Sequence, residues 1–182
     1  MFKKSLLALG TALLISVSTP MESEAQTLMH NPNAIEWEQR GNDKKVKIVE
    51  ADTPSGMAIS AYTKKRKQNP WDIALYFDLD KGVKKGDKVS VTMWVRTAKA
   101  AKGQDTAEFV LFMGRNEEPY DYIMSENVLP STEWELLKFE AVAEASMPDD
   151  DVKVEFQLAK HKQTIEFGPI FVNNLGPAKP EG

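Results

Sequence analysis

The segment KVSVTMWVRT, residues 88–97, alternates between apolar and polar side chains at every second position. Successive side chains of a β-strand point to opposite faces of a sheet, so this period of two predicts a strand. The apolar face carries Val89, Val91, Met93 and Val95. The other face should meet water, yet it carries Trp94 beside Arg96.

The same alternation runs through most of the chain, and no stretch keeps a helical period of 3.6 for three turns. Further strands are expected at residues 45–51, 57–62, 71–79, 107–114, 120–128, 134–143, 151–159 and 163–173. Many short strands separated by polar turns are typical of a β-sandwich. The sequence therefore predicts an all-β fold of two antiparallel sheets.

The N-terminal residues have a different character. Lys3 and Lys4 precede an apolar run from Leu6 to Val17, and Ser23 and Ala25 then place small residues at the two positions that a signal peptidase reads. This order predicts a signal peptide over residues 1–25, cleaved near Ala25, and a secreted or bacterial periplasmic location. An uncleaved anchor is the alternative, although the run is too short to span a bilayer. We expect one domain over residues 26–177 and a disordered tail over 178–182.

Charge and cysteine content narrow the classes of function. The net charge is −4 and no broad basic patch is visible, which argues against nucleic acid as a partner. The basic run at residues 64–67 is read as a solvated turn, with contact to an acidic polymer as the alternative. The chain has no cysteine, so disulfides and a lipoprotein anchor are excluded.

Trp94 and Arg96 are the first candidate binding residues. An indole is a flat apolar plate on which a sugar ring can stack, and a guanidinium is a rigid fork of hydrogen-bond donors. Gln157 and Glu155 would add polar partners if their strand lies nearby. The structural alternative is that a loop covers Trp94 and that Arg96 pairs with a carboxylate on the adjacent strand.

Catalytic motifs are scarce. There is no cysteine nucleophile and no Gly-x-Ser-x-Gly turn, and the two histidines, His30 and His161, have no zinc-type spacing. His30 is expected in a disordered N-terminal stretch and His161 in a solvated turn. The acidic run at residues 149–151 is read as a turn, with a calcium site as the alternative.

Four segments in order resemble secreted carbohydrate-binding modules of family 4/9. They are NPWDIALYF (69–77), KKGDKVSVTMWVRT (84–97), LPSTEWELLKFEA (129–141) and KQTIEFGPIFVNNLGP (162–177). The resemblance covers residues 33–177. It implies a galactose-binding-domain-like jelly roll, a non-catalytic sugar-binding role and often a structural calcium, with no other cofactor.

The resemblance also suggests where sugar would bind. Carried over by motif, it points to Trp71, Trp94, Arg96 and Gln163. Tyr120 and Tyr122, in the segment EEPYDY, are further candidates for stacking. Together with Gln157, these residues make up the predicted binding set.

Three functions follow. The first is binding of a polysaccharide or oligosaccharide without chemistry, with a polysaccharide-degrading enzyme as a possible partner in trans. The second is a stand-alone lyase or hydrolase on the same scaffold, which would use Arg96, Gln157, His161 and Tyr122. The third is an envelope domain that binds another protein through an open sheet.

Overall fold

The computed structural model describes residues 26–32 and 37–179. It contains eleven strands and one short 3-10 helix in the described residues, in the order β1 (Thr27–Leu28), β2 (Glu38–Arg40), β3 (Lys44–Glu50), β4 (Met57–Thr63), η1 (Pro70–Asp72), β5 (Ala74–Asp78), β6 (Asp87–Lys99), β7 (Phe109–Arg115), β8 (Tyr122–Val128), β9 (Glu135–Val142), β10 (Val152–Gln157) and β11 (Gln163–Pro177). The predicted signal peptide lies outside the described residues.

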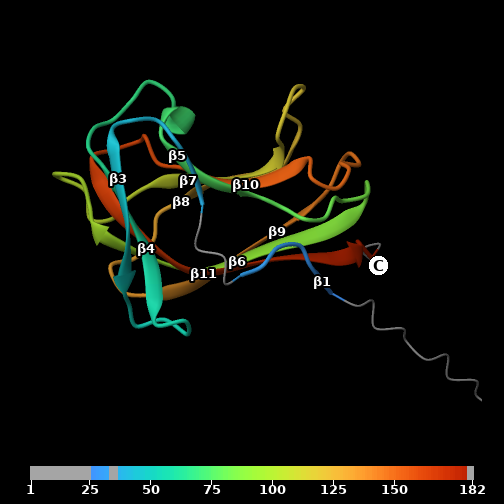
Figure 1. Cartoon of the computed structure of the whole chain (residues 1–182), viewed down its shortest axis with the longest axis horizontal. Coiled ribbons are helices and arrows are strands. Elements are labelled where there is room, and N and C mark those ends of the chain that lie inside the picture. Colours follow the sequence, from blue (N-terminus) through green and yellow to red (C-terminus); the bar gives the residue numbers. More distant parts are fainter. Residues whose placement is uncertain (1–25, 33–36, 180–182) are drawn as a thin grey trace, which may run out of the picture.

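The strands form two antiparallel sheets packed face to face (Figure 1). The six-stranded sheet has the order β3-β4-β11-β6-β9, and β1 pairs with the end of β11. The five-stranded sheet has the order β2-β5-β10-β7-β8. Neighbouring strands come from distant parts of the sequence, as in β10 between β5 and β7. This topology confirms the predicted all-β antiparallel sandwich.

The alternating residues of both sheets meet in one core. All four apolar residues of the 88–97 segment, which belongs to β6, are fully buried. Phe109, Phe156 and Phe167 meet at the centre, with ring centroids between 4.7 and 6.0 Å apart. Trp37 stacks on Phe156 at 5.2 Å and closes one side of this cluster. Burial of these large rings is the main source of stability in a fold without disulfides.

Most predicted strands are confirmed to within a few residues, but two features differ. The strands β1 and β2 were not expected from the sequence, because they contain only two and three residues. Trp71 does not begin a strand as predicted. It lies in η1, where Pro70 starts the turn and the Asp72 carboxylate accepts a hydrogen bond from the Asn69 N–H at 3.0 Å.

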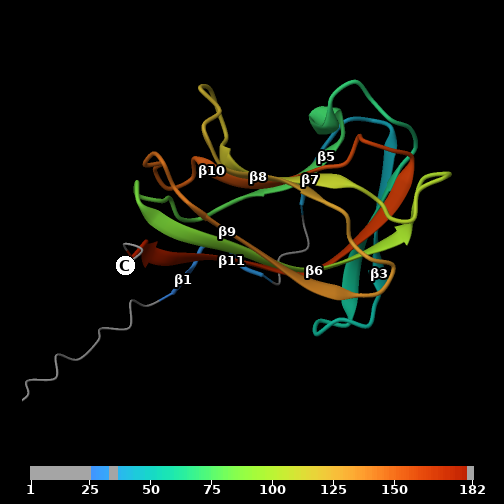
Figure 2. The ribbon, with the colours of Figure 1, turned by 180° about the vertical axis from the view of Figure 1, so that it is seen from behind.

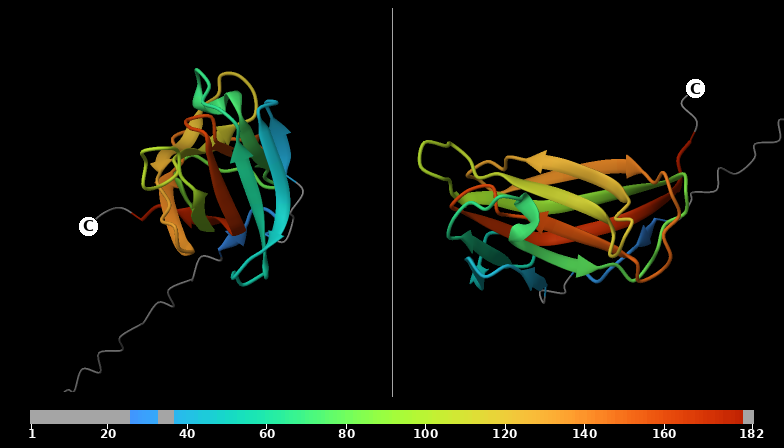
Figure 3. Two further views of the ribbon diagram at one scale, coloured as in Figure 1. Left: turned by 90° about the vertical axis from the view of Figure 1, so that its left-hand side faces the viewer. Right: turned by 90° about the horizontal axis from the view of Figure 1, so that it is seen from above.

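Two loops rise on the outer side of the five-stranded sheet. One loop carries η1, and the other joins β7 to β8. The view from the front and the view from behind both show the two loops on the same side of the sandwich (Figures 1 and 2). Seen along the other axes, β3 and β4 lie at one edge, and β1 lies beside the C-terminal part of β11 (Figure 3). Because these two loops project beyond the strands, the outer face of the five-stranded sheet is uneven.

The chain leaves the sandwich at Pro177. Ala178, the first residue of the predicted disordered tail, still donates a backbone hydrogen bond to the Gly86 carbonyl at 2.8 Å. Residues 180–182 lie outside the described part. Within the described residues, no helix is long and apolar enough to cross a membrane.

Candidate functional site

A groove lies on the outer face of the five-stranded sheet, between the two raised loops. Its volume is about 510 Å³, within the range of small-molecule sites. The lining residues come from five separate segments: Arg40, Trp71, Phe112, Tyr120, Lys153, Glu155 and Gln157. Three of the predicted binding residues, Trp71, Tyr120 and Gln157, are therefore brought together here.

Trp71 forms one wall of the groove. Its side chain is 50% exposed, which is unusual for so large an apolar group. Its backbone is held firmly, because the Arg40 Nε donates to the Trp71 carbonyl at 2.9 Å. The indole is thus presented to solvent from a fixed backbone, as a stacking surface requires.

Tyr120 forms the opposite wall and is 55% exposed. Its backbone has φ 53°, in the left-handed region that non-glycine residues rarely adopt. Holding a tyrosine there costs about 1 kcal/mol, and such strain gathers at binding sites. The next aromatic residue, Tyr122, is 62% exposed, and its ring centroid lies 6.5 Å from that of Phe112, which lines the groove.

The floor of the groove is polar and charged. Glu155, on β10, is only 2% exposed and forms an ion pair with the Arg40 guanidinium. The Lys153 Nζ lies 3.3 Å from the other Glu155 oxygen. The buried carboxylate is therefore paired with two cations, and these ion pairs fix the donors around it. Gln157 continues the same row along β10 with an amide that can donate and accept.

Tyr76 supports this floor from β5. The Arg40 guanidinium carbon lies 5.8 Å from the Tyr76 ring centroid, and the Lys153 Nζ lies 5.6 Å from it. A hydrogen bond to the Glu38 carboxylate raises the pKa of the Tyr76 hydroxyl, and burial raises it further. The tyrosine therefore stays neutral at physiological pH, and its ring lies close to both cations.

The family of the chain follows from its sequence match. A family model described as "Carbohydrate binding domain", of type 4/9, matches residues 30–163. The chain belongs to this family. The predicted resemblance is confirmed, and the aromatic groove lies in a carbohydrate-binding domain. No curated protein is similar enough in sequence to count as a relative.

Solved structures with the same fold agree with this assignment. The second N-terminal cellulose-binding domain of Cellulomonas fimi β-1,4-glucanase C has a TM-score of 0.61 and 14% identity, covering 87% of this chain and 99% of that one. The CBM22-1 xylan-binding domain of Paenibacillus barcinonensis Xyn10C has a TM-score of 0.55 and 12% identity, with coverage of 85% and 95%. The CBM22-1–GH10 modules of Clostridium thermocellum Xyn10B, complexed with xylohexaose, have a TM-score of 0.53 and 13% identity, with coverage of 80% and 27%.

Trp94 and Arg96 lie on the other sheet of the carbohydrate-binding domain. Both side chains face outward from β6. The strand of Gln157 and Glu155, β10, belongs to the other sheet, so the condition for these residues to be polar partners of Trp94 is not met. Arg96 binds the Glu166 carboxylate on the neighbouring strand, with Nε and Nη2 at 2.8 and 2.7 Å from Oε2. The Arg96 guanidinium also lies 4.9 Å from the Trp134 ring centroid. The pairing of Arg96 with Glu166 on the adjacent strand is the structural alternative given for Arg96 in the sequence analysis.

Trp94 is half-buried and packs against the backbone of β11. A side chain on Gly168 would come within 2.9 Å of the Trp94 Cβ, so the glycine permits this close contact. Thr53 approaches the same point, and Leu136 is paired with Trp94 across the strands. The indole is partly covered, as the structural alternative foresaw. A role for Trp94 in sugar binding stays a prediction.

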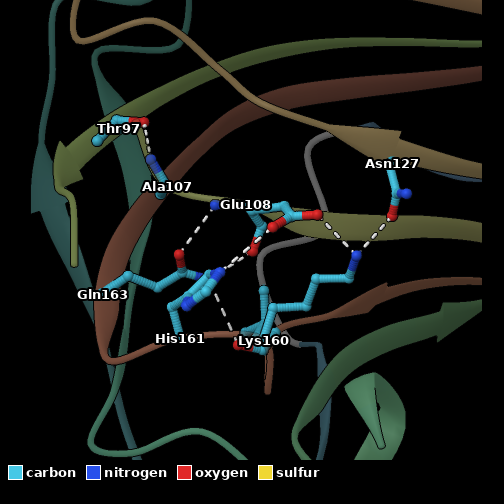
Figure 4. A network of polar contacts seen from close by, with 8 residues as sticks. Thr97, Ala107, Glu108, Asn127, Lys160, His161 and Gln163 are labelled. Atoms are coloured by element: carbon cyan, nitrogen blue, oxygen red, sulfur yellow. Dashed lines mark hydrogen bonds and ion pairs between the residues drawn. The ribbon is translucent and has the colours of Figure 1, made fainter. Parts of the chain in front are cut away.

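Gln163 is buried, with 1% of its surface exposed, and cannot reach the groove. Its side chain pairs with the backbone of Glu108: the Glu108 N–H donates to Gln163 Oε1 at 2.9 Å, and Gln163 Nε2 donates to the Glu108 carbonyl (Figure 4). The structure gives Gln163 a structural contact, and a ligand contact of this residue stays a prediction. The amide ties the start of β11 to the start of β7.

The histidines also differ from expectation. His161 Nε2 lies 3.3 Å from the Glu108 carboxylate, which also accepts from Lys160 at 2.7 Å (Figure 4). His30 is not in a disordered stretch, since its ring stacks on Phe77 at 4.6 Å. Burial lowers the pKa of the His30 imidazole, so the ring is neutral near neutral pH.

The residues proposed for a lyase site do not assemble. Arg96 projects from the six-stranded sheet, Gln157 and Tyr122 belong to the five-stranded sheet, and His161 lies in the turn between β10 and β11. At residues 149–151, Asp149 accepts from the Gly82 N–H at 2.8 Å and Asp151 pairs with Arg115 at 2.6 Å. No group of three potential metal-binding side chains occurs in the described parts of the chain.

The sequence reasoning missed three groove residues, namely Arg40, Phe112 and Lys153. Arg40 belongs to a strand too short to show a period. Phe112 lies in the predicted strand 107–114, which was not considered for binding, but its ring lines the groove. Lys153 lies in the predicted strand 151–159, and nothing in the sequence placed it beside Trp71 or Tyr120.

Proposed function

We propose that this domain binds a linear, neutral polysaccharide across the five-stranded sheet, between Trp71 and Tyr120, and does no chemistry on it. The observation that carries the proposal is two exposed aromatic walls facing a polar floor in one groove. The C–H faces of pyranose rings stack on the walls, and the sugar hydroxyls exchange hydrogen bonds with Gln157, Arg40 and Lys153.

The class of glycan is proposed from the related structures. Those proteins are a cellulose-binding domain, a xylan-binding domain and a module pair complexed with xylohexaose. Cellulose and xylan are unbranched or little-branched β-1,4-linked chains, and an exposed groove suits an internal stretch of such a chain. We therefore propose a β-1,4-linked glucan or xylan as the ligand class.

The lack of chemistry is supported by the groove itself. Glycoside hydrolysis generally needs two carboxyl groups on either side of the scissile bond. Among the residues that line this groove, Glu155 is the one carboxylate, and Arg40 and Lys153 hold it. A single neutralised carboxylate binds hydroxyls well but makes a poor acid–base pair.

We further propose that the domain works outside the cytoplasm, after removal of residues 1–25. There it would bind the same polysaccharide that a separate degrading enzyme cleaves in trans. The charged n-region and apolar run support export. Purifying the protein from the producing cells and sequencing its N-terminus tests the cleavage. A mature chain beginning near Gln26 is expected, and one beginning at Met1 contradicts export by this route.

Binding is tested by titrating cellohexaose and xylohexaose into the mature domain by calorimetry. Saturable binding of at least one hexasaccharide is expected, with weak affinity because one or two stacked rings must offset the cost of association. Incubation with the matching polymers should release no reducing ends and no unsaturated ends absorbing in the ultraviolet. Turnover at the groove, abolished by Glu155→Gln, would contradict the non-catalytic assignment.

A further inference from the structure

A second groove lies on the opposite face of the domain, over the outer side of the six-stranded sheet. Its volume is about 720 Å³. It is lined by segments of four adjacent strands: Lys45, Val46 and Lys47 of β3, Ser60 and Tyr62 of β4, Thr164 and Glu166 of β11, and Ala98 and Lys99 of β6. The two grooves are separated by the whole thickness of the sandwich, so they are independent sites.

The charge of this second groove is unlike that of the rest of the chain. Lys45, Lys47 and Lys99 are all exposed, and none has a carboxylate partner in the described residues. The one acidic residue of the lining, Glu166, is already paired with Arg96. Three uncompensated ammonium groups therefore gather in a chain of net charge −4.

Several other lysines of the described residues are neutralised by a neighbouring carboxylate, in contrast to these three. Lys67, Lys88, Lys138 and Lys160 each have a carboxylate within ion-pair distance. On one face of β3, two lysines at alternate positions are about 7 Å apart along the strand. Such a row attracts an anion that repeats along a chain, and the attraction grows as ionic strength falls.

The floor between the lysines offers hydroxyl groups. Ser60, Tyr62 and Thr164 line the groove, and none of their side chains takes part in a hydrogen bond within the described residues. Hydroxyls that can donate and accept suit sugar hydroxyls, and the Tyr62 ring supplies an apolar surface beside them. The groove thus combines sugar-type contacts with cations.

We propose that this second groove binds a carboxylate-bearing glycan, a polyuronate, through Lys45, Lys47 and Lys99. The carboxylates of successive uronate residues face the ammonium groups, while hydroxyls of the same rings meet Ser60 and Thr164. One molecule then holds an acidic chain on one face and a neutral chain on the other. The acidic site does not depend on the neutral-sugar groove.

The experiment measures binding of polygalacturonate to the mature domain by affinity electrophoresis and by titration at low and physiological ionic strength. Binding that weakens as salt rises is expected. The triple variant Lys45→Gln, Lys47→Gln, Lys99→Gln should bind polygalacturonate about tenfold more weakly at low salt, as the loss of three exposed ion pairs implies. Its affinity for the neutral hexasaccharide should not change.

The matched control removes the same charge elsewhere, as Lys81→Gln, Lys84→Gln, Lys85→Gln in the segment before β6. The control should keep polygalacturonate binding within twofold, and so should Trp71→Ala. Equal losses in both triple variants would overturn the proposal, as would loss of polyuronate binding in Trp71→Ala. A DNA duplex that binds as tightly, and depends on the same three lysines, would show unspecific attraction of polyanions and overturn it too.

Discussion

Replacing Trp71 with alanine should abolish most sugar binding while leaving the fold intact. The indole lies in η1, a helix with no buried residue, and Arg40 contacts the Trp71 backbone carbonyl rather than its ring. The substitution therefore opens no cavity in the core and breaks no side-chain hydrogen bond. Unfolding temperature should stay within about 2 °C, since surface substitutions of this kind change stability little.

The expected loss of affinity can be worked out from exposed area. A tryptophan presents at most roughly 150–250 Å², and with 50% exposed about 100 Å² is open to a ligand. A pyranose covering most of that area contributes about 2 kcal/mol at ~25 cal/mol per Å². Removing it should weaken binding about 30-fold.

The assay is calorimetric titration of the hexasaccharide that the wild type binds best, with Trp94→Ala as the matched control. Trp94 is also an outward tryptophan, but it lies on the other sheet and packs against Gly168 and Thr53. Its replacement should leave the affinity within twofold. A Trp71→Ala domain that binds as well as wild type, or a Trp94→Ala domain that loses binding without unfolding, would refute the assignment of the groove.

Three further outcomes are expected. Gln163→Ala should lower the free energy of unfolding by about 2 kcal/mol, and the melting temperature by several degrees, because the part-buried N–H and carbonyl of Glu108 lose their partner. Sugar affinity measured by titration should be unchanged. Tyr120→Gly should be about 1 kcal/mol more stable to urea than Tyr120→Ala, since glycine accepts φ 53° without strain, yet both should bind sugar more weakly. Burial lowers the pKa of His30 in the folded state, so the unfolded chain takes up the proton first and the free energy of unfolding falls as pH drops below 6.5. In His30→Phe, which keeps an aromatic ring stacked on Phe77, urea denaturation from pH 7 to 5.5 should show a smaller fall in this free energy. A fall equal to that of the wild type would contradict this cause.

The fold could be predicted from the sequence because its signal is local. In β6 and β10, apolar residues recur at every second position, and the structure buries all of these apolar residues in the core. Because one face of each strand is buried, its side chains must be apolar at every second position. This alternation can be recognised within a single segment, without knowing which strand pairs with it. Strands as short as β1 and β2 give no such period, and they were missed for that reason.

The site could be predicted only in part, because a binding groove is defined by which strands become neighbours. Trp71, Tyr120 and Gln157 were chosen as exposed aromatics and a polar strand residue, which local sequence can suggest. Whether Trp94 stands on the same face depends on the order of the strands. That order puts β6 in one sheet and β10 in the other.

The sequence by itself determined the alternation of buried and exposed positions, the all-β class and the family to which the domain belongs. Only the tertiary structure decided that Arg40 and Glu155, 115 positions apart in the chain, form one ion pair under the aromatic walls. The physical reason is that the alternation of buried and exposed positions is a property of each single strand. A groove or an ion pair, in contrast, exists only after long-range strand pairing has brought distant segments together.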